Sequence, residues 1–450
     1  MQRAGGQRRR GKPFALALAA LLASGDTRPL PQRPAAVTAP NVTTTRRFGP
    51  LILLNIATLL SATGNGIVIV ALPWLVLEQT GRATDAAIVA GAATVPLLLA
   101  SLFSGTVVDR FGRRPTSLVS DALSGLSVAA IPVIAGTVGL SVPVLALLAA
   151  LGATFDPAGI SARESMLPAA TRAAGWRLDR VNSLYEANYN VAYLIGPGIG
   201  GVLIALVGPE TTLWVTAVCF ALSIVTIAFL KLEHAGRPDT ETRPSSMWTG
   251  TLEGLRFVWR DRLLRTLALV DMVIVALYLP IESVLFPKYF TDRGDPAQLG
   301  WVLMAMSIGG LVGALSYGAL APHLERRNLM LIAVSGLGLS MVGMAFLPPL
   351  WILLALCAVI GLVYGPVGPI ANWAMQTRSP EHMRGRVVGV MTSTAYAAGP
   401  LGYLLAGPLI DQAGIRTTFF VLAVPVILVA VVCFRLPVLR ELDADSRPDP

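Results

Sequence analysis

The stretch 51–77, LILLNIATLLSATGNGIVIVALPWLVL, decides the fold because none of its side chains is charged. An α-helix rises about 1.5 Å per residue, so a helix of this length crosses the ~30 Å hydrocarbon core of a membrane. The composition agrees, since 54% of the 450 residues are hydrophobic and only 14% are charged, against roughly 25% charged residues in soluble domains. We therefore expect a polytopic membrane protein rather than a water-soluble enzyme.

Apolar runs long enough to span a membrane recur along the rest of the chain. They cover residues 51–77, 86–108, 115–138, 141–162, 181–207, 211–230, 263–290, 299–321, 328–347, 349–377, 383–410 and 417–434. Short apolar turns alternate with longer basic connections, which is the pattern of an even number of crossings. The sequence predicts an all-α fold with twelve transmembrane helices.

The distribution of positive charge predicts the orientation, because cytoplasmic loops are enriched in Lys and Arg. If both termini are cytoplasmic, only four of the 35 Lys and Arg residues lie outside: Arg82, Lys288, Arg293 and Arg416. The net charge of +9 then faces anionic lipid headgroups and is no argument for a nucleic-acid partner. We expect a multi-pass protein of a bacterial cytoplasmic membrane, with both termini inside.

Residues 1–47 differ in kind from the spans. Arg8, Arg9, Arg10 and Lys12 precede an apolar run at 14–23, which resembles a signal peptide but is too short to cross a bilayer. No Met occurs between Met1 and Met166. We expect this stretch to be a disordered basic extension, in part a start-site artefact, with translation beginning near Val37 or Val42.

Short motifs recur in the two halves of the chain. GATFDP at 152–157 corresponds to GLVYGP at 361–366, Ala192-Tyr193 with Gly196-Pro197 corresponds to Ala395-Tyr396 with Gly399-Pro400, and Gly105 precedes Arg113-Arg114 as Gly318 precedes Arg326-Arg327. Such repeats are typical of transporters whose halves rock about a midplane site. We expect six-helix halves at 48–230 and 263–435, a cytoplasmic linker at 231–262 and a cytoplasmic tail at 436–450.

The turn between the second and third spans carries a dense motif at 105–114, GTVVDRFGRR. Its defining residues are Gly105, Asp109, Arg110, Gly112, Arg113 and Arg114. This pattern resembles the loop that marks the major facilitator superfamily, and the resemblance implies a gate. The Asp109 carboxylate would accept hydrogen bonds at the start of the eleventh helix and oppose its dipole, which would hold the cytoplasmic side closed. The simpler alternative is a basic turn capped by Gly112.

A second motif lies in the fifth span and consists of Gly196, Pro197, Gly200 and Gly201. It resembles the antiporter motif of that superfamily's drug exporters, although Ala192 stands where Gly is usual. Small residues let helices approach closely, and Pro197 leaves the carbonyl of Tyr193 without its helical donor. We expect a bend at the interface between the halves. A nucleotide-binding glycine loop is rejected because no strand precedes the motif.

Further segments resemble the mycobacterial multidrug efflux pumps over about residues 48–442. They are 74–77, 121–125, 174–176, 282–290 and 384–391. The resemblance implies proton-driven export of tetracyclines and aminoglycoside-type antibiotics by a monomer, with the proton gradient in place of a cofactor. One departure is that antiporters of this kind commonly carry an intramembrane Arg on the fourth helix. The span 141–162 has none, and we place Arg163 at the cytoplasmic end.

The carboxylates left inside the spans are Asp121, Asp156, Glu186, Asp271 and Glu282. Burying an ionised one costs roughly 2.5 to 3.5 kcal/mol, and a carboxyl group in a low dielectric binds a proton more readily than one in water. We expect the last four to carry protons and Asp121 to join the charge network of the 113–114 turn. For Asp156 the alternative is a bend at its neighbour in sequence, Pro157.

On the seventh span, Asp271, Tyr278 and Glu282 share one helical face, with the two acids roughly 16 Å apart. This stripe suits a hydrated proton or cation path, whereas an interfacial ion pair between Asp271 and Arg265 is the alternative. Aromatic, Met and amide side chains suit a drug cavity; the candidates are Trp74, Tyr189, Tyr193, Tyr278, Trp373, Met375 and Gln376. The scattered Cys and His residues predict no metal site.

The leading hypothesis is a proton-coupled secondary transporter that exports amphipathic drugs by alternating access. One alternative is a flippase or exporter of lipids or cell-envelope precursors with the same fold, because an amphipathic cavity suits lipids as well as drugs. A solute importer for sugars or peptides is a third possibility. No phosphate-binding loop that would support ATP hydrolysis occurs in the sequence.

Overall fold

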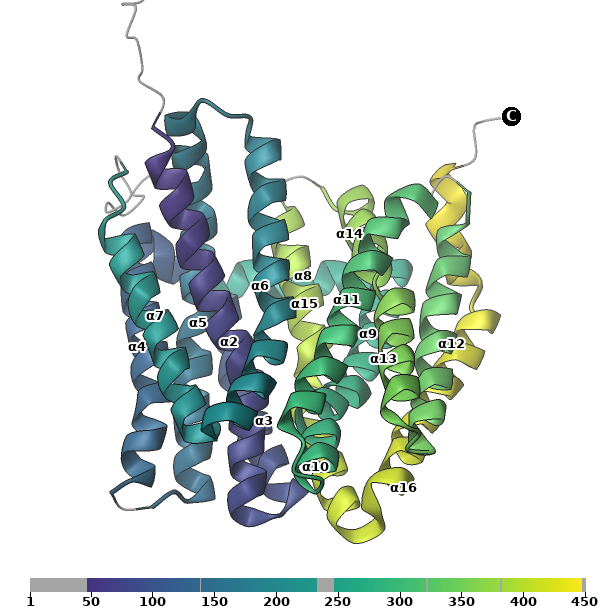
Figure 1. Ribbon diagram of the computed structural model, residues 1–450. Helices are drawn as coiled ribbons and strands as arrows, with labels where there is room; N and C mark the ends of the chain where they lie inside the picture. The colour runs from purple at the N-terminus through teal and green to yellow at the C-terminus, as the bar shows by residue number, and fades with distance from the viewer. Residues whose placement is uncertain (1–46, 138, 233–246, 321–322, 381–382, 447–450) are drawn as a thin grey trace, which may run out of the picture. The chain divides into compact units, whose positions relative to one another are not determined.

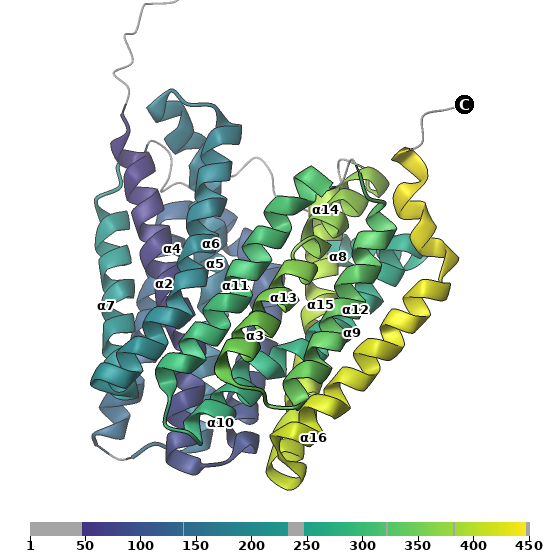
Figure 2. The ribbon, with the colours of Figure 1, turned by 45° about the vertical axis from the view of Figure 1, so that its right-hand side comes forward.

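The computed structural model describes residues 47–137, 139–232, 247–320, 323–380 and 383–446. Nearly all of the extension expected at 1–47 lies outside these residues. Within them the chain forms helices and no β-strand, as Figures 1 and 2 show. The all-α prediction is thereby confirmed.

Six long helices make up the N-terminal half, drawn in purple to teal in Figure 1. They are α2 (Gly49–Thr80), α3 (Ala83–Phe111), α4 (Arg113–Ala135), α5 (Val142–Ala174), α6 (Leu178–Val207) and α7 (Pro209–Ala228). Each contains one of the first six predicted spans, apart from a few terminal residues of the third, fourth and sixth. Glycines at 81, 112, 175 and 208, all with positive φ, end helices here, because glycine adopts this conformation without steric cost.

The C-terminal half is built from shorter pieces, drawn in green to yellow in Figure 1. They are α9 (Arg262–Pro280), η1 (Ile281–Leu285), α10 (Phe286–Thr291), α11 (Pro296–Leu320), α12 (Arg326–Ala345), α13 (Leu350–Tyr364), α14 (Val367–Arg378), α15 (Arg384–Ala397) and α16 (Gly399–Arg435). The seventh span is α9, η1 and α10 in series. The tenth span is α13 followed by α14.

Eleven segments of the described residues are long and apolar enough to cross a membrane, and the last of these runs from Arg386 to Arg435. That segment contains both the eleventh and the twelfth predicted spans. Gly414 breaks it with φ 81° and ψ 165°, a backbone conformation that residues other than glycine rarely adopt. The segment therefore makes two crossings, and the prediction of twelve crossings is confirmed.

The internal repeat is visible in the geometry of the turns. Gly208, between α6 and α7, has φ 82° and ψ 165°, nearly the same values as Gly414 in the second half. Arg114 donates to the last carbonyls of α7, at Ile227 and Ala228, and Arg327 donates to the carbonyl of Phe434 near the end of α16. Equivalent residues of the two halves therefore make equivalent contacts.

The helices define two ends of the bundle. We call the end with the turns near Gly112, Gly175 and Glu325 the motif end, and the end with Gly81, Gly208 and Gly414 the far end. The linker contributes α8 (Met247–Arg260), which the sequence analysis did not anticipate. Its Glu253 forms a 2.6 Å ion pair with Arg386 of α15 at the motif end.

The tail after α16 is also ordered. The 3-10 helix η3 (Pro437–Ser446) places the Asp443 carboxylate 2.7 Å from the backbone nitrogen of Arg326, the first residue of α12. An aspartate at this position satisfies a donor that the helix itself leaves free. Leu439 and Leu442 of the same segment are fully buried.

Several helix contacts in the C-terminal half bring backbone directly against backbone. A Cβ at Gly402 of α16 would lie 1.8 Å from the carbonyl oxygen of Ala276 in α9. A Cβ at Gly361 of α13 would lie 2.0 Å from the carbonyl oxygen of Met306 in α11. Only glycine permits such approach.

We expect Gly402→Ala to destabilise the protein by about 1 to 3 kcal/mol, because the added methyl forces α16 away from α9. The matched control is Gly389→Ala in α15, where a Cβ would have no neighbour within 4 Å. There the change should be neutral or stabilise by ~0.5 to 1 kcal/mol. Thermal unfolding of the purified protein in detergent measures both, and equal melting temperatures for the two variants would contradict the close contact.

Candidate functional site

A cavity of about 410 Å³ lies between the two halves. Its walls come from α6 on one side and from α9, η1, α11, α13 and α15 on the other. The polar and aromatic lining residues are Asn190, Tyr278, Glu282, Ser307, Tyr364 and Tyr396. The remaining walls are apolar or glycine, including Leu194, Leu279, Met306 and Leu311. Mostly apolar walls with a few polar groups are typical of small-molecule sites of this size.

Glu282 reaches the cavity from an irregular turn. Pro280 has no backbone N–H, so the carbonyl of Ala276 loses its usual helical donor, and the chain continues as the short π-helix η1. Such π-turns inside α-helices are frequent at functional sites. The Glu282 carboxylate makes no hydrogen bond or ion pair with the residues that the structure describes. It is thus a lone acid in the wall of a mostly apolar cavity.

Asp271 contacts the cavity through a tyrosine. The Tyr364 hydroxyl donates to the Asp271 carboxylate at 2.7 Å, and the Tyr364 ring stacks on Tyr278 with centroids 6.1 Å apart. Arg265, the expected alternative partner, donates instead to the carbonyl of Trp259. The stripe predicted on the seventh span therefore has Tyr278 and Glu282 in the cavity wall and Asp271 behind Tyr364.

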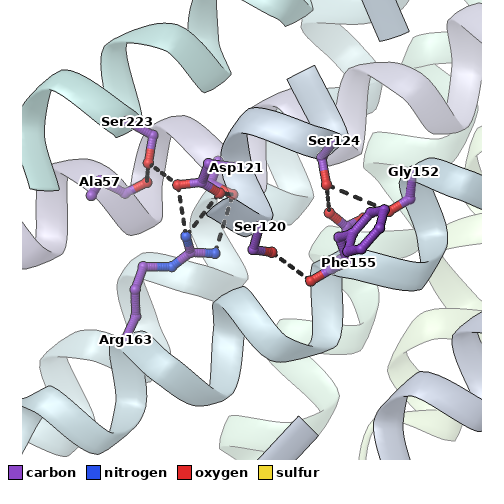
Figure 3. Close-up of polar contacts among 10 residues, drawn as sticks. Ala57, Ser120, Asp121, Ser124, Gly152, Phe155, Arg163 and Ser223 are labelled. Carbon is purple, nitrogen blue, oxygen red and sulfur yellow. Dashed lines mark hydrogen bonds and ion pairs between the residues drawn. The ribbon is translucent and has the colours of Figure 1, made fainter. Parts of the chain in front are cut away.

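Asp121 and Arg163 correct two expectations. Helix α5 continues to Ala174, so Arg163 lies well inside it and is only 3% exposed, rather than at the end of a span. Its guanidinium binds both Asp121 carboxylate oxygens at 3.0 Å, as Figure 3 shows. The assignment of Asp121 to the charge network of the 113–114 turn was wrong, because its partner is Arg163.

This ion pair joins four helices of the N-terminal half. Ser223 of α7 donates to Asp121 at 2.7 Å, and Ser61 of α2 donates to it at 3.1 Å. Arg163 also donates to the Ser61 hydroxyl at 3.1 Å. Asp121 lies on α4 and Arg163 on α5, so α2, α4, α5 and α7 share one buried polar cluster (Figure 3). Its charges neutralise one another, which fits a structural role.

Two predicted proton carriers of the N-terminal half lie away from the lining of the cavity. Asp156 accepts a 2.7 Å hydrogen bond from Ser124 of α4, within its own half. Glu186 is exposed and lines a separate pocket of α5 and α6 with Glu164 and Tyr185. The structure thus brings Glu282 and Asp271 together around one chamber and places Asp156 and Glu186 elsewhere.

The residues of the 105–114 motif lie at the motif end. Asp109 and Arg110 are exposed, and Asp109 makes no ion pair with any described residue. Arg114 caps α7 within its own half, as described above. Gly112 has φ 90° and lets α3 turn sharply into α4, while Gly105 lies inside α3 and Arg113 begins α4. The predicted target of Asp109 is the start of α15, where the N-cap residue Met383 supplies no side-chain cap.

The glycines of the second motif pack on two helices. Gly196 and Gly200 face α2, where Cβ atoms would lie 2.7 Å from the Gly66 Cα and 3.3 Å from the Ile67 Cα. Gly201 faces the other half, where a Cβ would lie 2.5 Å from the carbonyl oxygen of Pro296. The carbonyl oxygen of Pro197 would lie 2.8 Å from a Cβ at Gly300 of α11. The motif therefore lies at the interface between the halves.

The predicted substrate residues are dispersed. Tyr278 lines the cavity, whereas Tyr189 is partly buried on α6 and the side chain of Tyr193 lies outside the description. Trp373 packs under the Arg326 guanidinium, 4.0 Å from its ring centre, and Gln376 is exposed. Trp74 and Met375 are buried in the core. Tyr364 and Tyr396, which the sequence analysis missed, line the cavity instead.

Two sequence signals could have identified three of the missed residues. Asp121 has no cation near it in its own span, and a buried carboxylate requires a partner, so the nearest Arg of a neighbouring span, Arg163, was the natural candidate. Tyr364 lies inside the repeated motif at 361–366, and Tyr396 lies in the repeated pair Ala395-Tyr396. For these tyrosines the repeat was the available signal.

Fold, cavity and paired motifs are those of a membrane transporter, and a family model agrees. The model described as Major Facilitator Superfamily matches residues 54–403 and, in a second match, 283–449. The chain belongs to the major facilitator superfamily, and it is a multi-pass membrane transporter rather than an enzyme. The resemblance to this superfamily expected from the 105–114 motif is confirmed.

Several efflux pumps are similar to this chain over most of its length. The multidrug efflux pump Tap of Mycolicibacterium fortuitum is 57% identical over 410 residues, covering 90% of this chain and 100% of the relative. Tap of Mycobacterium tuberculosis is 57% identical over 404 residues, covering 89% of this chain and 96% of the relative. Macrolide efflux protein A of Streptococcus pyogenes is 21% identical over 389 residues, covering 84% and 94%.

A solved structure shares the architecture. The crystal structure of the nucleoside transporter NupG superposes with a TM-score of 0.70, covering 86% of this chain and 98% of that chain at 12% identity. At this level of identity the match establishes the fold alone. The nature of the cargo has to be argued from the cavity and from the closer relatives.

We expect single removal of either ion-pair partner, by Asp121→Leu or Arg163→Met, to destabilise the protein by about 3 to 5 kcal/mol, because the remaining charge stays buried alone. The double variant Asp121→Leu with Arg163→Met should recover most of the loss. Asp292→Ala breaks the far more exposed Lys288–Asp292 pair and should cost at most ~1 kcal/mol. Thermal unfolding compares all four; a double variant no more stable than the singles would argue against a neutralised pair.

Proposed function

We propose that this chain is a proton-coupled exporter of amphipathic drugs that works by alternating access. The observation that carries the proposal is the lone carboxylate of Glu282 in the wall of the cavity between the halves. The relationship to pumps named for multidrug efflux supports drug export. Tetracyclines and aminoglycoside-type antibiotics are the cargo that we propose to test first.

The chemistry of the cavity supports amphipathic, cationic cargo. Tyr278, Tyr364 and Tyr396 offer aromatic faces to a flat or positively charged group, and Met306 supplies an adaptable thioether surface. Glu282 supplies the negative charge. Because Glu282 has no cation as a partner, a proton or a positively charged cargo can neutralise it, and competition between the two couples proton entry to cargo release.

Asp271 provides a second position for the proton. The Tyr364 hydroxyl lies between Asp271 and the cavity and donates to the carboxylate. A hydroxyl both donates and accepts hydrogen bonds, so Tyr364 can pass a proton between the chamber and Asp271. We propose Glu282 and Asp271 as the principal proton carriers and give Asp156 and Glu186 secondary roles, because both lie away from the chamber.

The proposed orientation places the motif end in the cytoplasm, together with both termini. The far end then faces outward, and the contacts between the halves at Gly201 and Pro296 close the outer side in this state. Export requires these contacts to open while Asp109 engages α15. A flippase for lipids or cell-envelope precursors remains the competing function, because the same chamber suits an acyl chain beside a charged headgroup.

We expect Glu282→Gln to reduce the rate of proton-driven tetracycline transport in proteoliposomes by at least about tenfold. A tenfold loss of rate corresponds to ~1.4 kcal/mol in activation free energy. Tetracycline exchange without a proton gradient should persist, because it needs binding and alternation but no net proton movement. Asp271→Asn should behave similarly, whereas the exposed far-end control Glu210→Gln should match the wild type. Wild-type rates of gradient-driven transport by both Glu282→Gln and Asp271→Asn would refute proton coupling through this chamber. If the wild type translocates a fluorescent lipid and does not transport tetracycline, the flippase is favoured.

A further inference from the structure

One carboxylate fastens the two halves together at the far end. Asp411 lies on α16, and it accepts hydrogen bonds from the backbone nitrogens of Ala83 at 2.8 Å and Thr84 at 2.9 Å. The Thr84 hydroxyl also donates to it at 2.5 Å. Arg82, the residue that precedes α3, contributes no side-chain cap. The first turn of α3 in one half is therefore capped by a residue of the other half.

The packing around the cap is tight enough to make it sensitive to movement. Gly407 lies about one turn before Asp411 on α16, and a Cβ there would be 2.6 Å from the Ala87 Cβ and 2.8 Å from the Thr84 Cα. A carboxylate at a helix N-terminus also faces the positive end of the helix dipole. Both interactions need α3 and α16 to touch, so neither survives separation of the halves at this end.

The cap is absent from the equivalent interface, where α6 packs on α11. Aligning Gly208 with Gly414, which have the same backbone conformation, places Ala205 at the position of Asp411. Helix α11 begins with Pro296, which has no backbone N–H to donate. The two interfaces, α3 with α16 and α6 with α11, therefore share the close helix contact. Only the α3–α16 interface has the aspartate cap.

The helix pair that carries the cap also carries the gate aspartate of the 105–114 motif. Helix α3 begins at the far end under Asp411 and reaches the motif end with Asp109. Helix α15, which leads into α16, begins at the motif end with Arg384, and its N-cap residue Met383 supplies no side-chain cap. Asp411 thus lies at the N-terminus of α3, and Asp109 lies at the opposite end of that helix.

We propose that Asp411 and Asp109 are reciprocal latches of the two access states. Asp411 caps α3 when the far end is closed, and Asp109 caps α15 when the motif end is closed. The rocking that brings one pair together separates the other, so each cap is made at the expense of its counterpart. The balance of the two caps sets the resting ratio of the states. This inference rests on the alternating access proposed above.

Distances between spin labels at both ends test the latch. We place one label pair at Glu210 and Phe346 at the far end and a second at Arg172 and Gln376 at the motif end, all exposed. Both pairs are read in a variant with Cys219, Cys357 and Cys433 replaced by Ala. We expect Asp411→Ala to increase the far-end-open population relative to the closed one by roughly 2- to 30-fold. The far-end distance should lengthen as the motif-end distance shortens.

Matched variants separate the latch from general loss of stability. Asp411→Asn keeps an acceptor oxygen and should shift the populations less than Asp411→Ala. Asp109→Ala should shift them in the opposite direction, and the Asp109→Ala, Asp411→Ala double variant should return towards the wild-type ratio. The control is Asp292→Ala, which removes a far-end carboxylate paired within its own half and should leave the distances unchanged.

Two failures are distinguishable. If both states are populated and respond to tetracycline, yet Asp411→Ala gives the wild-type distributions, the latch is wrong and alternating access stands. If no variant, with or without tetracycline, shows a second distance at either end, the chain does not alternate and both proposals fall.

Discussion

A charge persists in hydrocarbon only when it is paired, hydrated or neutralised by a proton, and this constraint organises the whole transporter. Asp121 satisfies it by binding Arg163 with two serines around the pair. Glu282 and Asp271 have no cationic partner among the described residues, and they lie at a chamber or behind its tyrosine. The same physical requirement therefore separates an acid that joins helices from the acids that we propose as proton carriers.

The two halves resist deformation by different means. The N-terminal half has four helices joined through one buried ion-pair cluster, whose strength depends on directional contacts between charged groups. The described part of the C-terminal half relies on glycine contacts, such as Gly361 of α13 against the Met306 carbonyl of α11. Both arrangements keep their helices together as units. In the proposed alternating access, motion is therefore concentrated where the halves meet, at α3 with α16 and at α6 with α11.

Much of the fold was readable from sequence because each span is a long apolar run, and the repeat and the 105–114 motif indicated the superfamily. The end of α5 could not be read in this way, because a hydropathy pattern ends a span at the first charged residue. The helix continues past Arg163, whose charge is paired with Asp121. The chamber was predicted in part: helical periodicity placed Tyr278 and Glu282 on one face, whereas the candidate substrate residue Trp373 packs against Arg326 instead of lining this chamber. Its partner Arg326 comes from a different helix. The Asp411 cap joins residues 328 positions apart, and no local pattern indicates such a contact.

The backbone contacts between helices also determine where this protein can vary over evolutionary time. At Gly402, Gly361 and Gly201 the adjoining carbonyl oxygens leave no room for any side chain, so these positions are closed to change. The apolar wall of the chamber, including Leu279 and Met306, faces open space on one side and can exchange one hydrophobic residue for another. If the chamber binds cargo as proposed, lineages can diversify what it recognises by altering a few wall residues, while the contacts between the helices stay constant.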